Sequence, residues 1–142
     1  MREIKFRARR ADKDEFAFGD LLTGMGYKKG KFFILPHLSY YPSDCHSVDG
    51  YEVIPETIGQ FTGLKDKNGK EIYEGDIILT PFIDPIFGGM VGEELCVKRE
   101  IMFNDGSYVV KVDNGFIYLE CFTRNGRAEI IGNIYDNKEY LV

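Results

Sequence analysis

The sequence predicts an all-β fold with little helix, and two observations support that prediction. Eleven Phe and nine Tyr make aromatic residues 14% of the 142-residue chain, a composition that favours strands over helices. Four Asn-Gly or Asp-Gly pairs also lie between segments that alternate as strands do, and each is expected to form a tight type I′ turn. These pairs are Asn68-Gly69, Asp105-Gly106, Asn114-Gly115 and Asn125-Gly126.

The N-terminal part, residues 1–60, contains four short strand candidates separated by clusters of Gly, Pro, Ser and Asp that suit loops. In the first candidate, 3–8, charged and apolar residues alternate, which predicts a half-buried strand with its charges in water. The other three candidates are 16–22, 31–35 and 50–54. The segment 36–49 is expected to be an irregular surface loop.

The C-terminal part, residues 61–142, is expected to form a β-meander. Segments 107–112 and 116–122 carry apolar residues on both faces, which indicates strands buried on both sides or closing a barrel. The Pro- and Gly-rich segment 80–94 is expected to be a loop or a loosely paired excursion, and 137–142 can form one helical turn. We therefore expect one domain, 1–142, in which additional N-terminal strands pack on a small SH3-like or barrel-like meander.

Three segments of the chain carry a recognisable set of motifs: the longest is 61–77, FTGLKDKNGKEIYEGDI, and two shorter ones are 2–8, REIKFRA, and 131–137, IGNIYDN. Together they resemble the YopX family of phage and prophage proteins, and the resemblance spans the chain. It implies an all-β fold with a barrel-like body and a phage or prophage origin, but no established activity and no catalytic residues. Arg9 and Arg10 depart from the family, which commonly has an aromatic and an acidic residue there.

Turn formation accounts for the residue types in the longest of these segments. Gly63 permits a bend, Asn68 and Gly69 make the hairpin turn, and Gly75 lets the chain enter the next strand at Asp76. We therefore predict a structural turn signature. The alternative is a binding surface built from the same hairpin, because loops presented by rigid strands often carry function.

Three cysteines, Cys45, Cys96 and Cys121, are odd in number and match no metal-ligand spacing, which favours a reducing compartment. Neither a signal peptide nor an apolar run of membrane-spanning length is visible. We expect a protein of the bacterial host cytoplasm.

The chain contains only poor candidates for a catalytic or metal-binding site. Asp44, Cys45 and His46 have the types found in thiol sites, and with His37 they form the best local metal set, but adjacent residues on an extended chain point to opposite sides. Paired carboxylates lie in Lys-rich or Gly-rich surroundings, and the glycines near 88 lack the ending of a phosphate-binding loop. We expect that the protein is not an enzyme and that it has no catalytic residue, no cofactor and no metal. A thiol site and a metal site are the lesser alternatives.

Charge is distributed unevenly along the chain. Residues 1–31 hold nine Lys or Arg against five Asp or Glu, while the remainder is acidic and brings the total to −5. One hypothesis is therefore a nucleic-acid-binding face on the basic N-terminal strand. Its residues would be Arg2, Lys5, Arg7, Arg9 and Arg10. The simpler interpretation is that these cations pair with the acidic remainder of the chain, residues 32–142.

The preferred hypothesis is a non-enzymatic protein-interaction or self-assembling module of a phage or prophage. Its partner would be an unknown protein or a second copy, joined through strand edges or aromatic surfaces. Candidate contact points are Tyr27, Tyr40, Tyr41 and the loop 81–87. Binding to nucleic acid is the alternative, and no membrane partner is expected.

Overall fold

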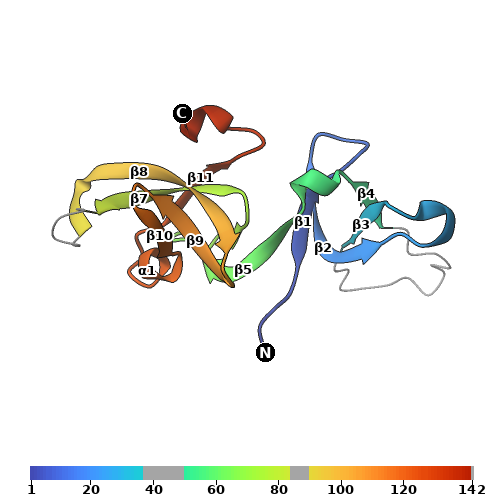
Figure 1. The fold of residues 1–142 in the computed structure, drawn as a ribbon, viewed down its shortest axis with the longest axis horizontal. Coiled ribbons are helices and arrows are strands. Elements are labelled where there is room, and N and C mark those ends of the chain that lie inside the picture. The colour runs from blue at the N-terminus through green and yellow to red at the C-terminus, as the bar shows by residue number, and fades with distance from the viewer. Residues whose placement is uncertain (37–49, 84–89, 142) are drawn as a thin grey trace. The chain divides into compact units, whose positions relative to one another are not determined.

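The computed structural model describes residues 1–36, 50–83 and 90–141, and it is nearly all β (Figure 1). This confirms the predicted fold class. The chain divides into two compact units, Met1–Phe61 and Thr62–Val142, at a boundary beside the expected division between 60 and 61. That the two units make one domain stays a prediction.

The first unit contains the four strands expected from the sequence. They are β1 (Phe6–Arg9), β2 (Phe16–Thr23), β3 (Phe32–Leu35) and β4 (Tyr51–Val53), hydrogen-bonded antiparallel in the order β4-β3-β2-β1. Short 3-10 turns, η1 (Gly26–Lys28) and η2 (Pro55–Thr57), follow β2 and β4. The first strand begins later than expected, at Phe6 rather than residue 3, because Phe6 is the first residue paired with β2.

The sheet of the first unit is strongly curled. Arg10 forms an isolated antiparallel bridge with Val53, and the backbone N–H of Ile54 donates to the carbonyl of Arg9 at 2.9 Å, so β4 returns to the end of β1. Ala8 and Ala17 lie opposite each other inside the curl, and their small side chains allow the strands to approach. The buried core of this unit is Ala8, Ala17, Ile34 and Val53.

The second unit is built on an antiparallel five-stranded sheet. Its strands are β7 (Asp76–Ile83), β8 (Met90–Asn104), β9 (Ser107–Val112), β10 (Gly115–Tyr118) and β11 (Glu129–Asn133), in the order β10-β9-β8-β7-β11. Strands β7 to β10 are sequential neighbours, so they form the meander expected from the sequence. Before them, β5 (Gly59–Lys65) pairs with β1 at its start and with β6 (Glu71–Tyr73) after it enters this unit.

The meander is an open sheet, and no closed barrel forms among the described strands. Its two edges are β10 and β11, which do not pair with each other. A bulge between Ile130 and Gly132 disrupts the regular ladder of β11 against β7, and the helical turn α1 (Glu120–Thr123) follows β10. Seven side chains form the buried core: Ile72, Ile78, Ile101, Val110, Leu119, Phe122 and Ala128.

The four predicted hairpin turns differ in geometry. Asp105 and Gly106 both have positive φ, 49° and 81°, as a type I′ turn between β8 and β9 requires. Val112 pairs with Gly115, so the turn between β9 and β10 is centred on Asp113 and Asn114 rather than on Asn114-Gly115. The predicted type I′ geometry is therefore wrong at this turn.

The other two pairs, Asn68-Gly69 and Asn125-Gly126, also depart from type I′ geometry. In Asn68-Gly69 only Gly69 has positive φ, and its N–H closes a turn onto the carbonyl of Asp66. Asn125-Gly126 does not join two strands at all, because it follows α1. Both predictions of type I′ geometry are wrong.

The segment 116–122 was expected to be one strand, but β10 stops at Tyr118 and the chain turns into α1. Leu119 and Phe122 are both fully buried. Positions three apart face opposite sides of a strand but the same side of a helical turn, so the turn is what lets both side chains enter one core. The expected turn at the C-terminus is present as the 3-10 helix η3 (Lys138–Leu141).

The segment 80–94 is more regular than expected. Strand β7 continues through Pro81 to Ile83, and β8 already begins at Met90, with a register shift between Pro81 and Phe82. Proline is tolerated at such a bulge because the ladder bond that it cannot donate is already interrupted there. Residues 84–89 within this segment, like 37–49, lie outside the described residues.

Candidate functional site

The basic residues at the start of the chain are engaged by neighbours within the first unit. Arg2 is exposed, before β1 begins. The ammonium of Lys5 lies 3.0 Å from a carboxylate oxygen of Glu3 and 5.0 Å from the centre of the Phe61 ring. These contacts occupy the Lys5 cation that the nucleic-acid hypothesis needs.

Arg7 and Arg9 lie against the Phe16 ring, although the alternation within residues 3–8 had predicted that the charge of Arg7 would be in water. The β1–β2 register places Arg9 opposite Phe16 and Arg7 opposite Phe18, so these four side chains share one face. Both guanidinium carbons are within 5 Å of the Phe16 ring centre, a cation–π geometry. The predicted environment of the basic strand was therefore wrong. The alternation within one strand does not show which side chains the neighbouring strand places against it.

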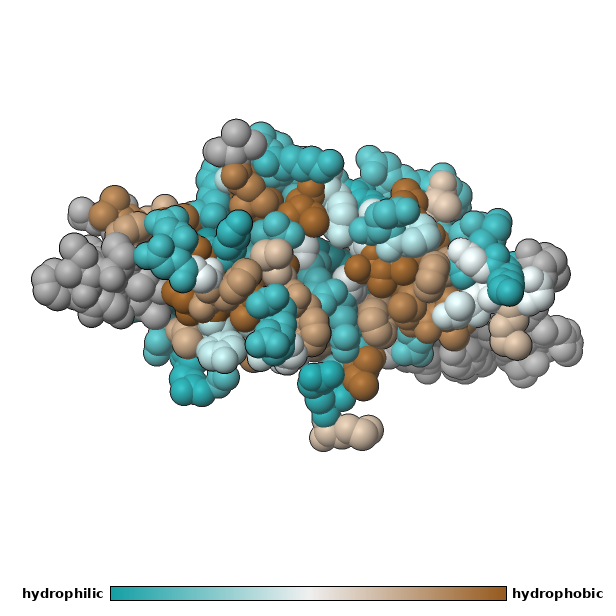
Figure 2. Space-filling model, viewed as in Figure 1, coloured by the Kyte–Doolittle hydropathy of each residue, from teal (hydrophilic) through white to brown (hydrophobic). Residues whose placement is uncertain are grey.

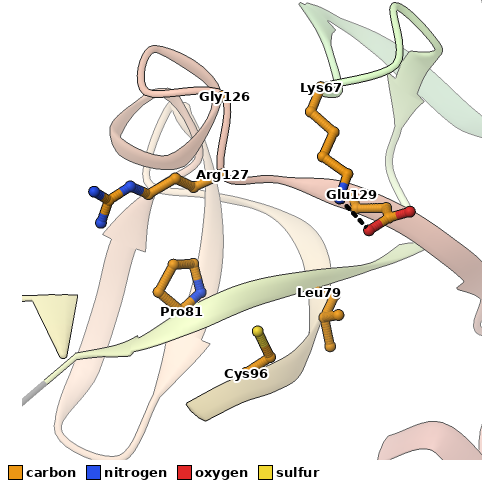
Figure 3. Close-up of a pocket in the computed structure, with 7 residues that line it drawn as sticks. All are labelled: Lys67, Leu79, Pro81, Cys96, Gly126, Arg127 and Glu129. Carbon is orange, nitrogen blue, oxygen red and sulfur yellow. Dashed lines mark ion pairs between the residues drawn. The ribbon is translucent and has the colours of Figure 1, made fainter. Parts of the chain in front are cut away.

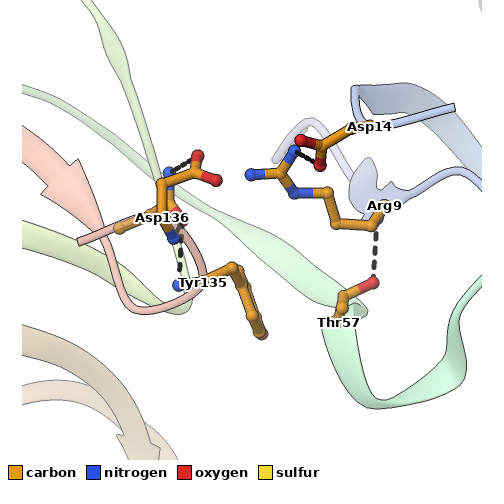
Figure 4. Close-up of polar contacts among 6 residues, drawn as sticks. Arg9, Asp14, Thr57, Tyr135 and Asp136 are labelled. Carbon is orange, nitrogen blue, oxygen red and sulfur yellow. Dashed lines mark hydrogen bonds and ion pairs between the residues drawn. The ribbon is translucent and has the colours of Figure 1, made fainter. Parts of the chain in front are cut away.

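Acidic side chains of the β1–β2 turn form ion pairs with Arg9 and Arg10, and Figure 4 shows the pair made by Arg9. The guanidinium of Arg9 donates to Asp14 at 2.7 Å, and the backbone N–H of Arg9 donates to the hydroxyl of Thr57 at 2.8 Å. Arg10 donates to both Asp12 and Glu15 and lies 3.9 Å over the Tyr51 ring.

The electrostatic effect of this turn is visible in one ion pair. The hydrogen bond between Arg10 and Asp12 raises the pKa of the Arg10 guanidinium and lowers the pKa of the Asp12 carboxyl. The Coulombic attraction between the two groups shifts both pKa values in the same directions. A phosphate binding at Arg10 would therefore have to compete with a carboxylate already in place. Arg9 and Arg10 thus pair with acidic residues of the same N-terminal segment, so the expectation that they pair with the acidic remainder of the chain is wrong for these two residues.

The turn between β5 and β6 is organised by one buried carboxylate. Asp66 accepts hydrogen bonds from the backbone N–H groups of Asn68 and Lys70, both at 2.9 Å, and from that of Ile130 at 3.1 Å. Gly69, with φ of 81°, completes the turn. Asn68 thus contributes its backbone to the turn, while Asp66 provides the side chain that holds it.

The β6–β7 turn uses a second buried carboxylate. Asp76 accepts from the backbone N–H of Tyr73 at 2.8 Å. Gly75 has φ of 82°, and its own N–H donates to the carbonyl of Ile101. Gly63, also at φ of 82°, lies within β5 beside Thr62, whose hydroxyl donates to the carbonyl of Ile72.

The segment IGNIYDN forms a turn after β11. The side-chain oxygen of Asn133 accepts from the backbone N–H groups of Tyr135 and Asp136, both at 3.0 Å, and its amide donates to the Asp136 carboxylate (Figure 4). A Cβ at Gly132 would lie 2.3 Å from the side-chain oxygen of Asn137, so a larger residue there would displace the Asn137 side chain, which accepts from the backbone N–H of Asn133. The motif segments 61–77 and 131–137 thus contain residues with defined roles in backbone turns.

A shallow groove of about 320 Å³ lies on the second unit (Figure 3). Leu79, Pro81 and Cys96 contribute from β7 and β8, and Lys67 and Glu129 form a 2.6 Å ion pair at its rim. Since the two opposite charges at the rim are already paired, the groove offers no isolated charge at that point with which to select a ligand.

Exposed aromatic side chains lie on the last strands of the meander. Phe116 and Tyr118 of β10 are 48% and 62% exposed, and Phe103 at the end of β8 is also exposed. Figure 2 shows hydrophobic residues at the surface among hydrophilic ones. The expectation that the segment 116–122 is buried on both sides is therefore wrong for Phe116 and Tyr118, because β10 is an edge strand.

The backbone of β10 presents unpaired groups on its outer side. The N–H of Leu119 donates to the carbonyl of Tyr108, and pairs alternate along an antiparallel ladder, so Gly115, Ile117 and Leu119 face β9. The N–H and C=O groups of Phe116 and Tyr118 therefore face away from the sheet. We call this outer side of Gly115–Tyr118 the β10 edge.

Sequence reasoning did not single out the β10 edge. A signal was nevertheless present: residues 115–119 contain no charged residue and no proline, the features with which natural edge strands avoid pairing. The candidates His37, Tyr40, Tyr41, Asp44, Cys45 and His46 lie outside the described residues, as does the side chain of Tyr27. In the ranges that the structure covers, no group of His, Cys, Asp and Glu is placed to hold a metal ion.

The fold and the turns define an all-β protein of two units whose buried carboxylates hold backbone turns. A family model described as YopX protein matches residues 5–142, and the chain belongs to the YopX family. No curated protein matches the chain. Among solved structures, the crystal structure of protein EF1440 from Enterococcus faecalis is similar over 99% of both chains, with 23% identity and a TM-score of 0.62, which shows the shared fold.

Proposed function

We propose that this protein is a non-enzymatic binding module that associates with other protein chains through the β10 edge, as an accessory protein of a phage or prophage. Membership of the YopX family supports the phage or prophage setting. The observation that carries the binding role is the combination, on one short strand, of outward-facing backbone groups and two exposed aromatic side chains.

The two edges of the five-stranded sheet are treated differently. At β11 the N–H of Ile130 is taken by Asp66, the carbonyl of Ala128 accepts from Lys67, and a bulge interrupts the ladder. At β10, within the described part of the chain, the strand is short but carries no charge, proline or bulge that would limit pairing. An edge left open in this way favours the addition of a strand from another chain, with backbone hydrogen bonds for affinity and side chains for specificity.

Phe116 and Tyr118 suit the role of contact residues. Aromatic rings bury a large area while fixing few torsions, and they are enriched at the centres of protein interfaces. Beside Tyr118, a hollow of about 400 Å³ is bounded by Glu120, Cys121, Arg124 and Asn125. A ring of a partner has room to pack there.

The non-enzymatic part of the proposal draws support from the buried carboxylates. Asp66 and Asp76, which are the buried acidic residues in the part of the chain that the structure covers, both accept backbone hydrogen bonds that hold turns. Their geometry serves the fold. The role of the basic strand as a nucleic-acid site is disfavoured because Arg9 and Arg10 are held by acids of the same unit.

Affinity capture from an infected host lysate, with and without nuclease, tests this function. The bait is the wild type, the edge variant Phe116→Lys/Tyr118→Lys, or the control Met25→Lys/Leu95→Lys, which adds the same charge at two other exposed apolar residues. We expect wild type and control to retain protein after nuclease and the edge variant to lose it. Equal capture by the edge variant, or complete loss on nuclease treatment, would contradict the proposal.

A further inference from the structure

We propose that the chain which pairs with the β10 edge is a second copy of this protein, joined antiparallel about a two-fold axis at Ile117. This inference rests on the proposed function and names its partner. The two sheets would then form one continuous sheet across the axis. The outward-facing backbone groups of β10 favour this partner, because few registers use all of them.

The outward-facing groups of β10 come in a self-complementary set. Phe116 and Tyr118 each present one N–H and one C=O, and Ile117 between them faces β9. In an antiparallel ladder, two residues that face each other exchange both of their hydrogen bonds. Placing Phe116 opposite Tyr118 of the second copy therefore makes two bonds, and the symmetry makes two more, so all four outward groups of each strand are used.

Neighbouring registers leave groups unused. If Phe116 lay opposite Phe116 of the second copy, Tyr118 would lie opposite Asn114, a central residue of the β9–β10 turn. If Tyr118 lay opposite Tyr118, Phe116 would face Glu120, the first residue of α1. The register centred on Ile117 alone keeps every pair within β10, and, as antiparallel self-pairing about a two-fold axis does, it gives a closed dimer.

The side chains fit the same register. Phe116 and Tyr118 are two positions apart, so they lie on one face of the sheet. Across the axis, each Phe116 ring would lie beside a Tyr118 ring, which gives two aromatic cross-strand pairs on that face. Each Phe116 would also lie at the hollow beside Tyr118 of the other copy. The strand carries no charge that would be brought against its own symmetry mate.

Sedimentation velocity over a wide concentration series tests the inference by charge exchange. In Phe116→Lys/Tyr118→Lys, lysine faces lysine across the axis, and we expect dimer affinity to fall by about tenfold or more. In Phe116→Lys/Tyr118→Glu, each lysine faces a glutamate, and we expect the dimer to return and to weaken with added salt. The control Met25→Lys/Leu95→Glu should associate as the wild type does.

A second variant removes a backbone donor without adding charge. Phe116→Pro deletes an outward N–H while leaving the bonds from β10 to β9, since proline is tolerated where the N–H faces solvent. We expect a monomer whose thermal midpoint, measured by circular dichroism in dilute solution, stays close to that of the wild type. That measurement separates lost pairing from lost folding for each variant.

Three results would overturn the inference: a wild type that stays monomeric throughout the series, lysine substitutions that leave association unchanged, or a Lys/Glu variant that stays as weak as the Lys/Lys variant. The proposed function has a separate outcome. A wild type that is monomeric but still captures host or phage protein through Phe116 and Tyr118 would contradict the dimer and would still support the β10 edge as a binding surface.

Discussion

The carboxylate of Asp66 accepts a hydrogen bond from the backbone N–H of Ile130, 3.1 Å away and 64 residues further along the chain. The same carboxylate holds the turn between β5 and β6 through Asn68 and Lys70. One side chain thus fixes a local hairpin and ties it to an edge strand of the meander. The turn and β11 depend on each other through it.

Replacing Asp66 by alanine tests this tie. Three backbone donors would lose a charged acceptor in a buried place, and we expect the free energy of unfolding to fall by about 2–4 kcal/mol. Urea denaturation followed by circular dichroism measures it. The neighbouring change Lys67→Ala removes only an exposed ion pair with Glu129 and should leave the midpoint nearly unchanged. Equal, small effects of both changes would contradict this role of Asp66.

Gly19 is required by a close approach of two strands. It has φ of 152°, and a Cβ there would lie 1.9 Å from the carbonyl oxygen of Leu35. Gly19→Ala should therefore destabilise the first unit by about 2 kcal/mol or more, measured by thermal unfolding. Gly30→Ala is the matched control, because Gly30 has φ of 86° and nothing within 4 Å of its added Cβ. A smaller loss at Gly19 than at Gly30 would be inconsistent with the close approach.

Burial raises the pKa of the Glu100 carboxyl above its ordinary value of 4.5. The folded state therefore holds this proton at pH values where the unfolded state has released it, so this group lowers stability as pH rises from about 4.5 through the raised pKa. Glu100→Gln removes that dependence. We expect its stability relative to wild type to increase across that window and to level off above it, in urea titrations at a series of pH values. A constant difference at all pH values would argue against a shifted Glu100.

The acidic residues of the β1–β2 turn should suppress nucleic-acid binding by the basic strand. Asp12→Asn/Asp14→Asn/Glu15→Gln removes the carboxylate charges that pair with Arg9 and Arg10 in this turn. Fluorescence anisotropy with a labelled single-stranded oligonucleotide should show weak binding by wild type and tighter, strongly salt-dependent binding by the variant. The control Asp105→Asn/Asp113→Asn/Glu139→Gln makes the same change in net charge elsewhere. Tight binding by wild type, unaffected by the triple change, would revive the nucleic-acid alternative.

Much of the fold could be predicted from local sequence. The strands β2, β3, β4 and β9 lie within one residue of the segments predicted as strands, and Asp105-Gly106 forms the type I′ turn that its residues favour. Val109 and Val110 are both buried, as expected of a strand with two apolar faces. These features depend on near neighbours in the chain, which the sequence displays directly.

The remaining features depend on contacts that a single segment does not reveal. Arg7 and Arg9 look solvent-facing along β1, yet the pairing register brings Phe16 against them. Phe116 and Tyr118 look like core residues, yet β10 has no neighbour on its outer side among the described strands. The topology of the sheet determines whether an apolar strand is central or at an edge. The position of β10 at an edge is what exposes the candidate binding surface.

Amide hydrogen exchange, resolved by residue with NMR in dilute and concentrated solution, tests the central claim most directly. In dilute solution the N–H groups of Phe116 and Tyr118 should exchange quickly, because they face solvent, while the N–H of Ile117 is protected by β9. In concentrated solution we predict that Phe116 and Tyr118 become protected and that Ile117 keeps its rate. Exchange at Phe116 and Tyr118 that is equally fast at both concentrations would contradict pairing of the β10 edge with a second copy.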